Sequence, residues 1–200
     1  MRVWMVRHGT TDANIRRQLL GADDPGLNDD GIIEGRWLAD YFQEMGVSDV
    51  VSSPSRRCVE TATAIGEACN LQVRIDPALR ERDLGSYDGL GVDEVVRRRR
   101  ALGHFFVDPT QDWSGESDVE SDAVVAQRVT AMLEPIRAVG KDVCLVTHAG
   151  VIKSMFHTLF AVAPDRRAVL KARNASILVF HLRDDGWNFE GMLSPRLWRG

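Results

Sequence analysis

The chain has 200 residues, the length of one sizeable α/β domain with a single hydrophobic core. It is 44% hydrophobic and 27% charged, which is ordinary for a soluble globular protein, and its net charge is −4. Nucleic-acid binders usually carry a basic excess, so this charge argues against a nucleic-acid partner. The apolar run at residues 3–6 is too short for a signal sequence or a membrane span. We therefore expect a cytoplasmic protein without membrane contact.

Three cysteines, Cys58, Cys69 and Cys144, are an odd number without a CxxC pair. This pattern argues against a disulfide framework and against a zinc ribbon. We expect reduced thiols that pack as small hydrophobic side chains.

The first half of the chain alternates short apolar runs with helical patterns. Residues 3–6 are wholly apolar, as expected of a strand covered on both faces. A helix is predicted over 31–46, with caps at 28–30 and a stop at Gly46. Its expected apolar face holds Ile33, Trp37, Tyr41, Phe42 and Met45. The next predicted elements are a strand at 50–51, a helix from Pro54 to Asn70 and a strand at 71–75.

The second half continues this alternation. Helices are predicted at 92–102, 121–139 and 151–160, and a buried strand at 142–147. Pro135 should kink the 121–139 helix or end its regular part. Polar residues 108–119 indicate a loop, and a hairpin is predicted from strands 177–182 and 187–193 around Asp185-Gly186. Strands alternating with helices predict one α/β domain over 1–200, a three-layer sandwich with helices on both faces of a mostly parallel sheet.

Two strand ends share one pattern. Residues 3–9 and 143–150 each form an apolar run that ends in a histidine, His8 or His148, with a glycine close behind. Because the carboxyl ends of strands form the ligand crevice of open α/β sheets, both histidines should reach the same edge. Gly9 and Gly150 would let the backbone turn or approach a ligand closely.

A third strand end leads into Ser55-Arg56-Arg57, in the first turn of a predicted helix. Helix N-termini attract anions through free N–H groups and the helix dipole, and arginine binds phosphate oxygens in a bidentate manner. Arg7 can bind phosphate in the same way from the first strand. Together with the two histidines, these residues predict a phosphate pocket.

The segment Arg7-His8-Gly9 resembles the signature of the histidine phosphatases and the cofactor-dependent phosphoglycerate mutases. The likeness continues through a first motif that includes Asn14 and then Gly21 and Gly31. It covers residues 2 to about 153.

Further motifs follow in the family's order. Residues 52–62 are similar to the segment SSPxxRxxETA, which makes Arg57 a phosphate ligand. Residues 79–85 resemble LxExxxG, which makes Glu81 the proton donor. Residues 115–117 and 147–150 look like the GES loop and the second histidine motif. Each motif is weak by itself, but five in sequence make the likeness specific.

In the mechanism that this resemblance implies, neutral His8 attacks phosphorus and forms a phosphohistidine. Arg7, Arg57 and His148 stabilise charge on the equatorial oxygens, and nearby cations keep His8 neutral by lowering its pKa. Glu81 protonates the leaving alkoxide and then deprotonates water. The resemblance implies no metal and no cofactor, and a substrate site made of Arg7, Asn14, Gly21, Arg57, His148 and Ala149.

The chain departs from the family pattern at several positions. Thr10 stands where Glu is most frequent, which changes the contacts around the leaving group, and Ala149 replaces a frequent Gly. Val92 stands where the mutases carry a substrate-binding lysine, and a paired-arginine, proline-rich segment is missing. These departures favour a phosphatase over a phosphoglycerate-type mutase. Within the family, the opening residues 1–4 and the segment 147–150 look like those of bacterial α-ribazole phosphatases and broad-specificity phosphatases.

Other interpretations of the same residues stay open. His8 and His148 could be satisfied buried histidines, or they could form a zinc site with Glu81, although two arginines at the same centre would repel a dication. A third alternative is a non-catalytic protein that binds phosphorylated ligands. The presence of both His8 and Glu81 argues against it, because binding alone needs no proton donor.

A run of arginines lies on the helix predicted at 92–102. Such a run is more often a solvated face than a lid that meets an acidic substrate, and residues 86–120 are the candidate lid segment. The arginine run consists of Arg97, Arg98, Arg99 and Arg100. Glu116, in the loop that follows, either supports the site or is a loop charge. The sequence thus predicts a metal-independent phosphomonoesterase for a small phosphorylated metabolite, and it leaves a homodimer open.

Overall fold

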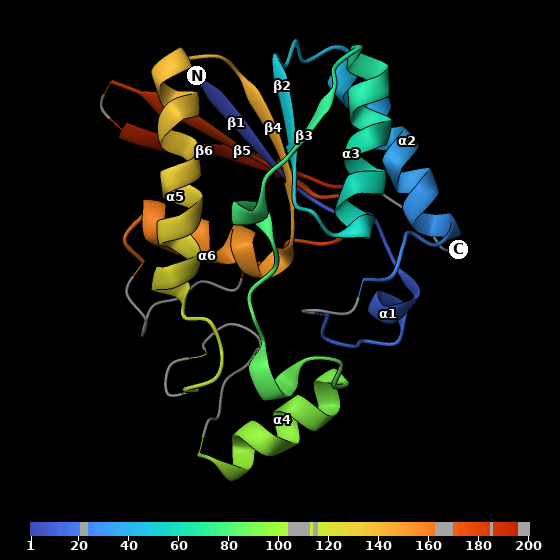
Figure 1. The fold of residues 1–200 in the computed structure, drawn as a ribbon, viewed down its shortest axis with the longest axis vertical. Helices are drawn as coiled ribbons and strands as arrows, with labels where there is room; N and C mark the ends of the chain where they lie inside the picture. The colour runs from blue at the N-terminus through green and yellow to red at the C-terminus, as the bar shows by residue number, and fades with distance from the viewer. Residues whose placement is uncertain (21–23, 104–112, 114–115, 163–169, 185, 196–200) are drawn as a thin grey trace.

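The computed structural model describes residues 1–20, 24–103, 113, 116–162, 170–184 and 186–195. Within these ranges six strands form one sheet in the order β3-β2-β4-β1-β5-β6 (Figure 1). The strands are β1 (Arg2–Arg7), β2 (Asp49–Ser52), β3 (Val73–Ile75), β4 (Val143–Thr147), β5 (Ile177–Arg183) and β6 (Gly186–Leu193). The pairs β1–β4, β2–β4 and β2–β3 are parallel, whereas β5 runs antiparallel to both β1 and β6. The predicted hairpin is therefore confirmed as β5–β6, and the predicted mostly parallel sheet is confirmed as well.

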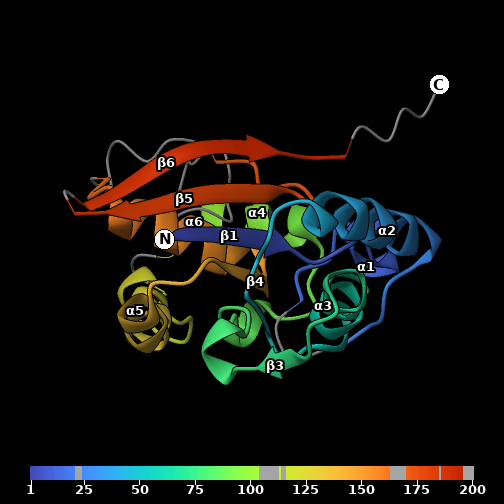
Figure 2. The same cartoon turned by 90° about the horizontal axis from the view of Figure 1, so that it is seen from above.

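Helices cover both faces of the sheet (Figure 2). On one face, α2 (Asp29–Gln43) and α3 (Arg56–Cys69) pack against Trp4 and Val6 of β1. On the other, α5 (Asp122–Val139) and α6 (Ala149–Leu159) pack against Val3 and Met5. Successive side chains of a strand point to opposite faces, so an apolar run without alternation needs a cover on each. This arrangement confirms the three-layer sandwich.

The apolar face of α2 differs in part from the prediction. The helix begins at Asp29 because the side chain of Asn28 accepts a hydrogen bond from Gly31 N, and it ends at Gln43 rather than at 46. Leu38 and Phe42 are fully buried in it, whereas Ile33 is 50% exposed. The assignment of Ile33 to the buried face was therefore wrong.

Other helix boundaries also follow from their caps. Helix α3 starts at Arg56 rather than at Pro54 and ends at Cys69, followed by Asn70 as a left-handed C-cap with φ 56°. Pro135 does not end α5, which continues to Val139. The short helix α1 (Asp12–Ile15) was not predicted; it rests on a reciprocal cap between Thr11 and Asn14. Among the described residues no helix is both long and apolar enough to cross a membrane.

Helix α4 (Val92–Ala101) stands apart from the three layers, beyond the carboxyl end of the sheet (Figure 1). It belongs to a small second core of Leu84, Tyr87, Val95, Trp113 and Val119. Residues 104–112 and 114–115 of the candidate lid segment lie outside the described ranges. The movement of this segment as a lid stays a prediction.

The arginine run on α4 divides into two kinds of side chain. Arg97, Arg98 and Arg100 are exposed, as a solvated helix face predicts. Arg99 is only 1% exposed; its Nε donates to Glu116 at 3.2 Å and its guanidinium lies 4.6 Å from the centre of the Trp113 ring. Glu116 also accepts a hydrogen bond from the Tyr87 hydroxyl at 3.0 Å. Glu116 therefore holds the small core of α4 together.

Candidate active site

The two predicted histidines lie side by side because their strands are neighbours. In the parallel β1–β4 pair, Arg7 is in register with Thr147, and His8 N donates to the Thr147 carbonyl at 3.0 Å. The His8 and His148 ring centres are 5.4 Å apart at an interplanar angle of 62°. The sheet topology thus explains how residues 140 positions apart in the chain meet at one edge.

The hydrogen bond of His8 fixes its tautomer. Its Nδ1 lies 2.7 Å from the Gly9 carbonyl oxygen, which can only accept, so Nδ1 carries the proton. In the neutral ring Nε2 then has its lone pair free for attack. Burial, and then the charges of Arg7 and Arg57, lower the His8 pKa well below its ordinary value. His8 is therefore neutral at neutral pH.

Close packing holds the His8 turn. A Cβ at Gly9 would lie 2.8 Å from the Gly31 carbonyl oxygen, so close approach explains this glycine. Gly9 N donates to Thr61 Oγ1 of α3 at 3.0 Å. The amide and hydroxyl of Thr10 donate to Glu34 of α2 at 2.6 and 3.0 Å. Thr10, the departure from the family pattern, thus ties the turn to α2.

His148 lies behind Arg57 and does not line the cavity that His8 faces. Arg57 Nη2 is 3.3 Å from His148 Nδ1, and an arginine can only donate, so Nδ1 accepts and Nε2 carries the proton. That proton is donated to Ser53 Oγ at 2.9 Å. Burial, followed by the charge of His8 and then of Arg57, lowers the pKa of His148 well below its ordinary value. In this arrangement His148 orients Arg57, whose side chain is only 1% exposed.

The expectation that the start of α3 receives an anion through its free N–H groups needs a correction. Arg56 N, the first amide of α3, donates to both carboxylate oxygens of Asp24, at 2.7 and 2.9 Å. Asp24 also pairs with Arg57 Nη1 at 3.5 Å. The start of α3 therefore contributes the Arg57 side chain to the cavity, and Ala149 and Gly150 in the first turn of α6 line the cavity as well.

Arg7 is held beside His8 by the segment that precedes β5. Its Nη1 donates to the Ala172 carbonyl at 2.8 Å, and burial lowers its pKa. Its Nε is buried and has no hydrogen-bond partner in the part of the chain that the structure describes. Because Arg7 also lines the cavity, its guanidinium can donate hydrogen bonds to an anion bound there.

Glu81 reaches the cavity from the loop after β3. Its Oε1 accepts from Arg82 N at 2.8 Å and its Oε2 accepts from Gly150 N at 3.3 Å. A Cβ at Gly150 would overlap the Glu81 carboxylate, which explains the glycine at this position. The Thr147 hydroxyl donates to the Leu79 carbonyl at 2.7 Å and anchors the loop to β4.

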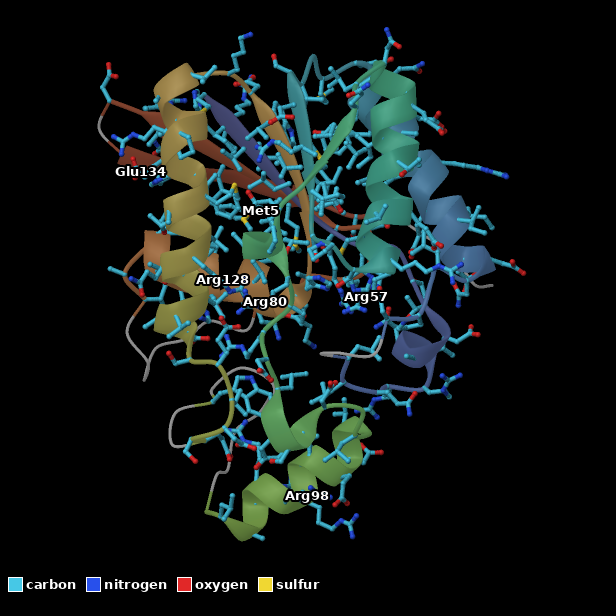
Figure 3. The ribbon with its side chains drawn as sticks, in the orientation of Figure 1. Met5, Arg57, Arg80, Arg98, Arg128 and Glu134 are labelled. Carbon is cyan, nitrogen blue, oxygen red and sulfur yellow. The ribbon has the colours of Figure 1, made fainter. Side chains whose placement is uncertain are left out.

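Arg128 of α5 holds the same loop from the other side. It donates to the carbonyl of Ala78 and, at 3.4 Å, to that of Glu81, and both Nε and Nη2 bind the Glu120 carboxylate. Figure 3 shows Arg128 on α5 beside Arg80 of this loop, and Arg57 at the same end of the sheet on α3. Glu81 therefore rests on a loop fixed at both sides.

Arg82 was missed by the sequence analysis. It is 4% exposed, and its guanidinium donates to Asp122, to Ser154 Oγ at 2.7 Å and to the Glu120 carbonyl at 3.0 Å. These contacts join the Glu81 loop to α5 and α6. No spacing rule predicts them, because the partners lie at 120–154 in the chain.

Asn174 was missed as well. Its Nδ2 donates to the carbonyls of His8 and Gly9 at 3.1 and 3.2 Å and to Asn14 Oδ1 at 2.9 Å. It thus joins the His8 turn to Asn14, which was predicted as a substrate ligand and which lines the cavity. An Asn before an apolar strand is a common turn signal, so the sequence alone did not distinguish it.

The cavity has a volume of about 450 Å³. Among the predicted site residues Arg7, His8, Asn14, Arg57, Glu81 and Ala149 line it. Gly21, also predicted as a substrate ligand, lies outside the described residues. Val92, the first residue of α4, lines the cavity with an aliphatic side chain at the position where the mutases carry lysine.

The cysteines and the zinc alternative can also be compared with the structure. Cys58, Cys69 and Cys144 are free thiols, as predicted. In the described ranges no group of three His, Cys, Asp or Glu side chains is arranged to hold a metal ion, the zinc alternative of His8, His148 and Glu81 included.

Known proteins resemble this chain over nearly its whole length. Residues 3–194 match the family model of the histidine phosphatase superfamily, branch 1. A phosphoglycerate mutase-like protein 4 of Arabidopsis thaliana is 35% identical over 93% of this chain and 82% of its own length. A probable phosphoglycerate mutase of Proteus mirabilis is 28% identical over 96% of this chain and 89% of its own.

Solved structures show the same fold. A mycobacterial glucosyl-3-phosphoglycerate phosphatase in complex with VO3 superimposes with a TM-score of 0.84 at 26% identity, over 97% of this chain and 99% of that chain. A putative α-ribazole-5'-phosphate phosphatase from Escherichia coli has a TM-score of 0.80 at 20% identity, over 98% and 97% of the two chains, a likeness of fold. The predicted resemblance is thus confirmed: the chain belongs to the histidine phosphatase superfamily.

Proposed function

We propose that the protein is a metal-independent phosphomonoesterase that hydrolyses a small phosphorylated metabolite through a phosphohistidine on His8. One observation carries the proposal. The Nδ1 of His8 donates to the Gly9 carbonyl, which leaves Nε2 unprotonated, and His8 lines a cavity together with Arg7, Arg57 and Glu81. A neutral imidazole between two guanidinium groups is suited to attack a phosphoryl dianion.

The reaction proceeds in two steps. His8 Nε2 bonds to phosphorus while the ester P–O bond breaks, and protonated Glu81 gives its proton to the departing oxygen. Glu81 then accepts a proton from water while the water oxygen bonds to phosphorus and the bond between phosphorus and His8 Nε2 breaks, which releases inorganic phosphate and restores neutral His8. Arg7 and Arg57 stabilise the charge on the equatorial oxygens, and His148 contributes by orienting Arg57.

Independence from metal is supported by the charges at the site. Arg7 and Arg57 already supply the positive charge that a dication would bring to the phosphoryl oxygens. Glu81 is the one carboxylate among the described residues that line the cavity. Two cations beside a single carboxylate would oppose the binding of Mg²⁺ or Zn²⁺.

Hydrolysis rather than mutase activity is supported by Val92. Its aliphatic side chain cannot make the contact with substrate that the lysine of the mutases makes at this position. The relatives named as phosphoglycerate mutases keep the mutase as the second candidate, and the phosphatases among the structural neighbours favour hydrolysis. A cytoplasmic location, the absence of a nucleic-acid partner and a homodimer stay predictions.

The test is to trap the intermediate. Brief quenching with labelled substrate should yield an acid-labile, base-stable phosphoprotein, and His8→Ala should yield none. Label on a serine or an aspartate would refute the mechanism. Efficient isomerisation of 3-phosphoglycerate that depends on 2,3-bisphosphoglycerate would instead establish the mutase.

A further inference from the structure

The cavity is far more basic than phosphoryl transfer requires. Seven of the described residues that line it are Arg or Lys, and Glu81 is the one acidic residue among them. The whole chain carries a net charge of −4, so the cations are concentrated at this cavity. Arg7 and Arg57 suffice for the oxygens of one phosphoryl group, and the remaining cations need another explanation.

Three of these arginines have carboxylate partners. Arg57 pairs with Asp24, Arg82 with Asp122, and Arg17 with Asp93 at 3.6 Å. These carboxylates offset the positive charge of the three arginines, and Arg82 also joins the Glu81 loop to α5 and α6. Lys153 has an interaction of its own.

Lys171 and Arg173 differ from the other cations. Both line the cavity, both are exposed, and neither has a carboxylate of the described chain within ion-pair distance. An exposed cation without a partner can bind an incoming anion without first breaking an ion pair.

The backbone holds these two side chains beside the phosphoryl site. Ala172, between them, is 4% exposed and its carbonyl accepts from Arg7 Nη1 at 2.8 Å. The next residue, Asn174, donates to the carbonyl of His8 at 3.1 Å. The exposed, buried, exposed pattern at 171–173 turns Lys171 and Arg173 away from the core and toward the mouth of the cavity. They are thus fixed next to a phosphate ligand while they remain accessible.

We propose that Lys171 and Arg173 form a subsite for a second anionic group on the alcohol part of the substrate. The proposal rests on the proposed function and narrows it: the preferred substrate is the phosphate ester of an alcohol that also carries a carboxylate or a second phosphate. Arg7 and Arg57 bind the transferred phosphoryl group, and the two exposed cations bind the charge that stays with the leaving alcohol.

The experiment compares esters that differ only in that second group. Glycerol 3-phosphate has a neutral alcohol, 3-phosphoglycerate replaces its terminal CH₂OH by a carboxylate, and glycerol 1,3-bisphosphate adds a phosphate. Phosphate release should show kcat/KM about 10-fold higher for one of the anionic esters, because an exposed ion pair contributes up to about fivefold and the subsite offers two cations. Whichever anionic ester is favoured identifies the carboxylate or the phosphate as the recognised group.

The double variant Lys171→Gln/Arg173→Gln should reduce this preference to within about 3-fold, mainly through KM, and rising salt should reduce it in the wild type. Lys141→Gln is the matched control, since Lys141 is exposed at the start of β4, at the opposite end of the sheet from His148. Equal kcat/KM for the three esters in the wild type, or a preference that the double variant retains, would overturn the subsite.

Failure of the proposed function can be told apart from failure of the subsite. Equilibrium binding of the same esters to His8→Ala needs no turnover. The anionic esters should have a lower Kd than glycerol 3-phosphate, and adding Lys171→Gln/Arg173→Gln to His8→Ala should remove this Kd ratio. If no ester is hydrolysed but this ratio is found, the phosphatase proposal fails and the subsite stands. If hydrolysis occurs and the ratio is absent, the subsite is refuted.

Discussion

The substitution Gly150→Ala tests whether Glu81 is the proton donor and whether its position is set by α6. The added Cβ would overlap the Glu81 carboxylate and lie 3.2 Å from Glu81 Cδ, whereas 3.6 Å to Arg82 Cβ is ordinary contact. To reach van der Waals distance the carboxylate must retreat by about 1 Å. The obstacle is the end of a flexible side chain, so we expect the fold to tolerate the change while the reaction suffers.

The expected magnitude follows from this displacement. A misplacement of about 1 Å can reduce a rate by about 10²-fold, and loss of general acid catalysis costs about 10²–10⁴-fold. Gly150→Ala should therefore lower the rate with an alkyl phosphate about 100-fold. The loss should be clearly smaller with p-nitrophenyl phosphate, because p-nitrophenolate departs with little help from an acid.

The assay is the pre-steady-state burst of each alcohol product, which reports the transfer to His8 alone. Gly35→Ala is the matched control: its Cβ would lie 3.6 Å from Ala64 Cβ, and alanine favours a helix interior, so activity should persist. Because Gly150 acts through Glu81, adding Gly150→Ala to Glu81→Gln should cost little more than Glu81→Gln alone. If Gly150→Ala slows both esters equally, or neither, the reasoning is refuted.

Three further outcomes are expected. First, the acid limb of the pH profile of kcat/KM should lie below pH 6.5, because burial and two arginines lower the pKa of His8. Arg57→Gln removes one of these cations and should raise the His8 pKa in an NMR titration. If that pKa does not rise, the arginine is not the cause. Secondly, Asp122→Ala should lower the free energy of unfolding by about 3 kcal/mol in urea, because it leaves the buried Arg82 charge unpaired. Arg74→Ala, at an exposed ion pair, should cost under about 1 kcal/mol, and equal losses would refute this ranking. Thirdly, activity should survive exhaustive chelation, and an enzyme revived only by added metal would exclude the proposed mechanism.

Local patterns were sufficient for most of the fold. The wholly apolar runs at 3–6 and 143–146 predicted strands covered on both faces, because a strand in a three-layer sandwich has no solvated side. The errors were local too: Ile33 fits the helical period, but α2 buries the narrower stripe that faces the sheet. Periodicity identifies a helix, whereas the neighbouring layer decides which of its faces is buried.

The sequence by itself determined the family and the chemistry available at the site. Arg7, His8, Arg57 and Glu81 follow short motifs, and a motif is local in the chain because a strand end and its turn must be built from consecutive residues. Their shared cavity could be inferred, since the carboxyl ends of parallel strands meet at one edge.

Only the tertiary structure decided how these residues are held and what else surrounds them. The place of His148 behind Arg57, the occupation of the α3 terminus by Asp24, and the contacts of Arg82 and Asn174 join residues far apart in the chain. A buried polar group takes whichever partner the packing brings within reach, and no sequence spacing encodes that choice. For the same reason no motif announces Lys171 and Arg173, which line the cavity on either side of the carbonyl that Arg7 binds.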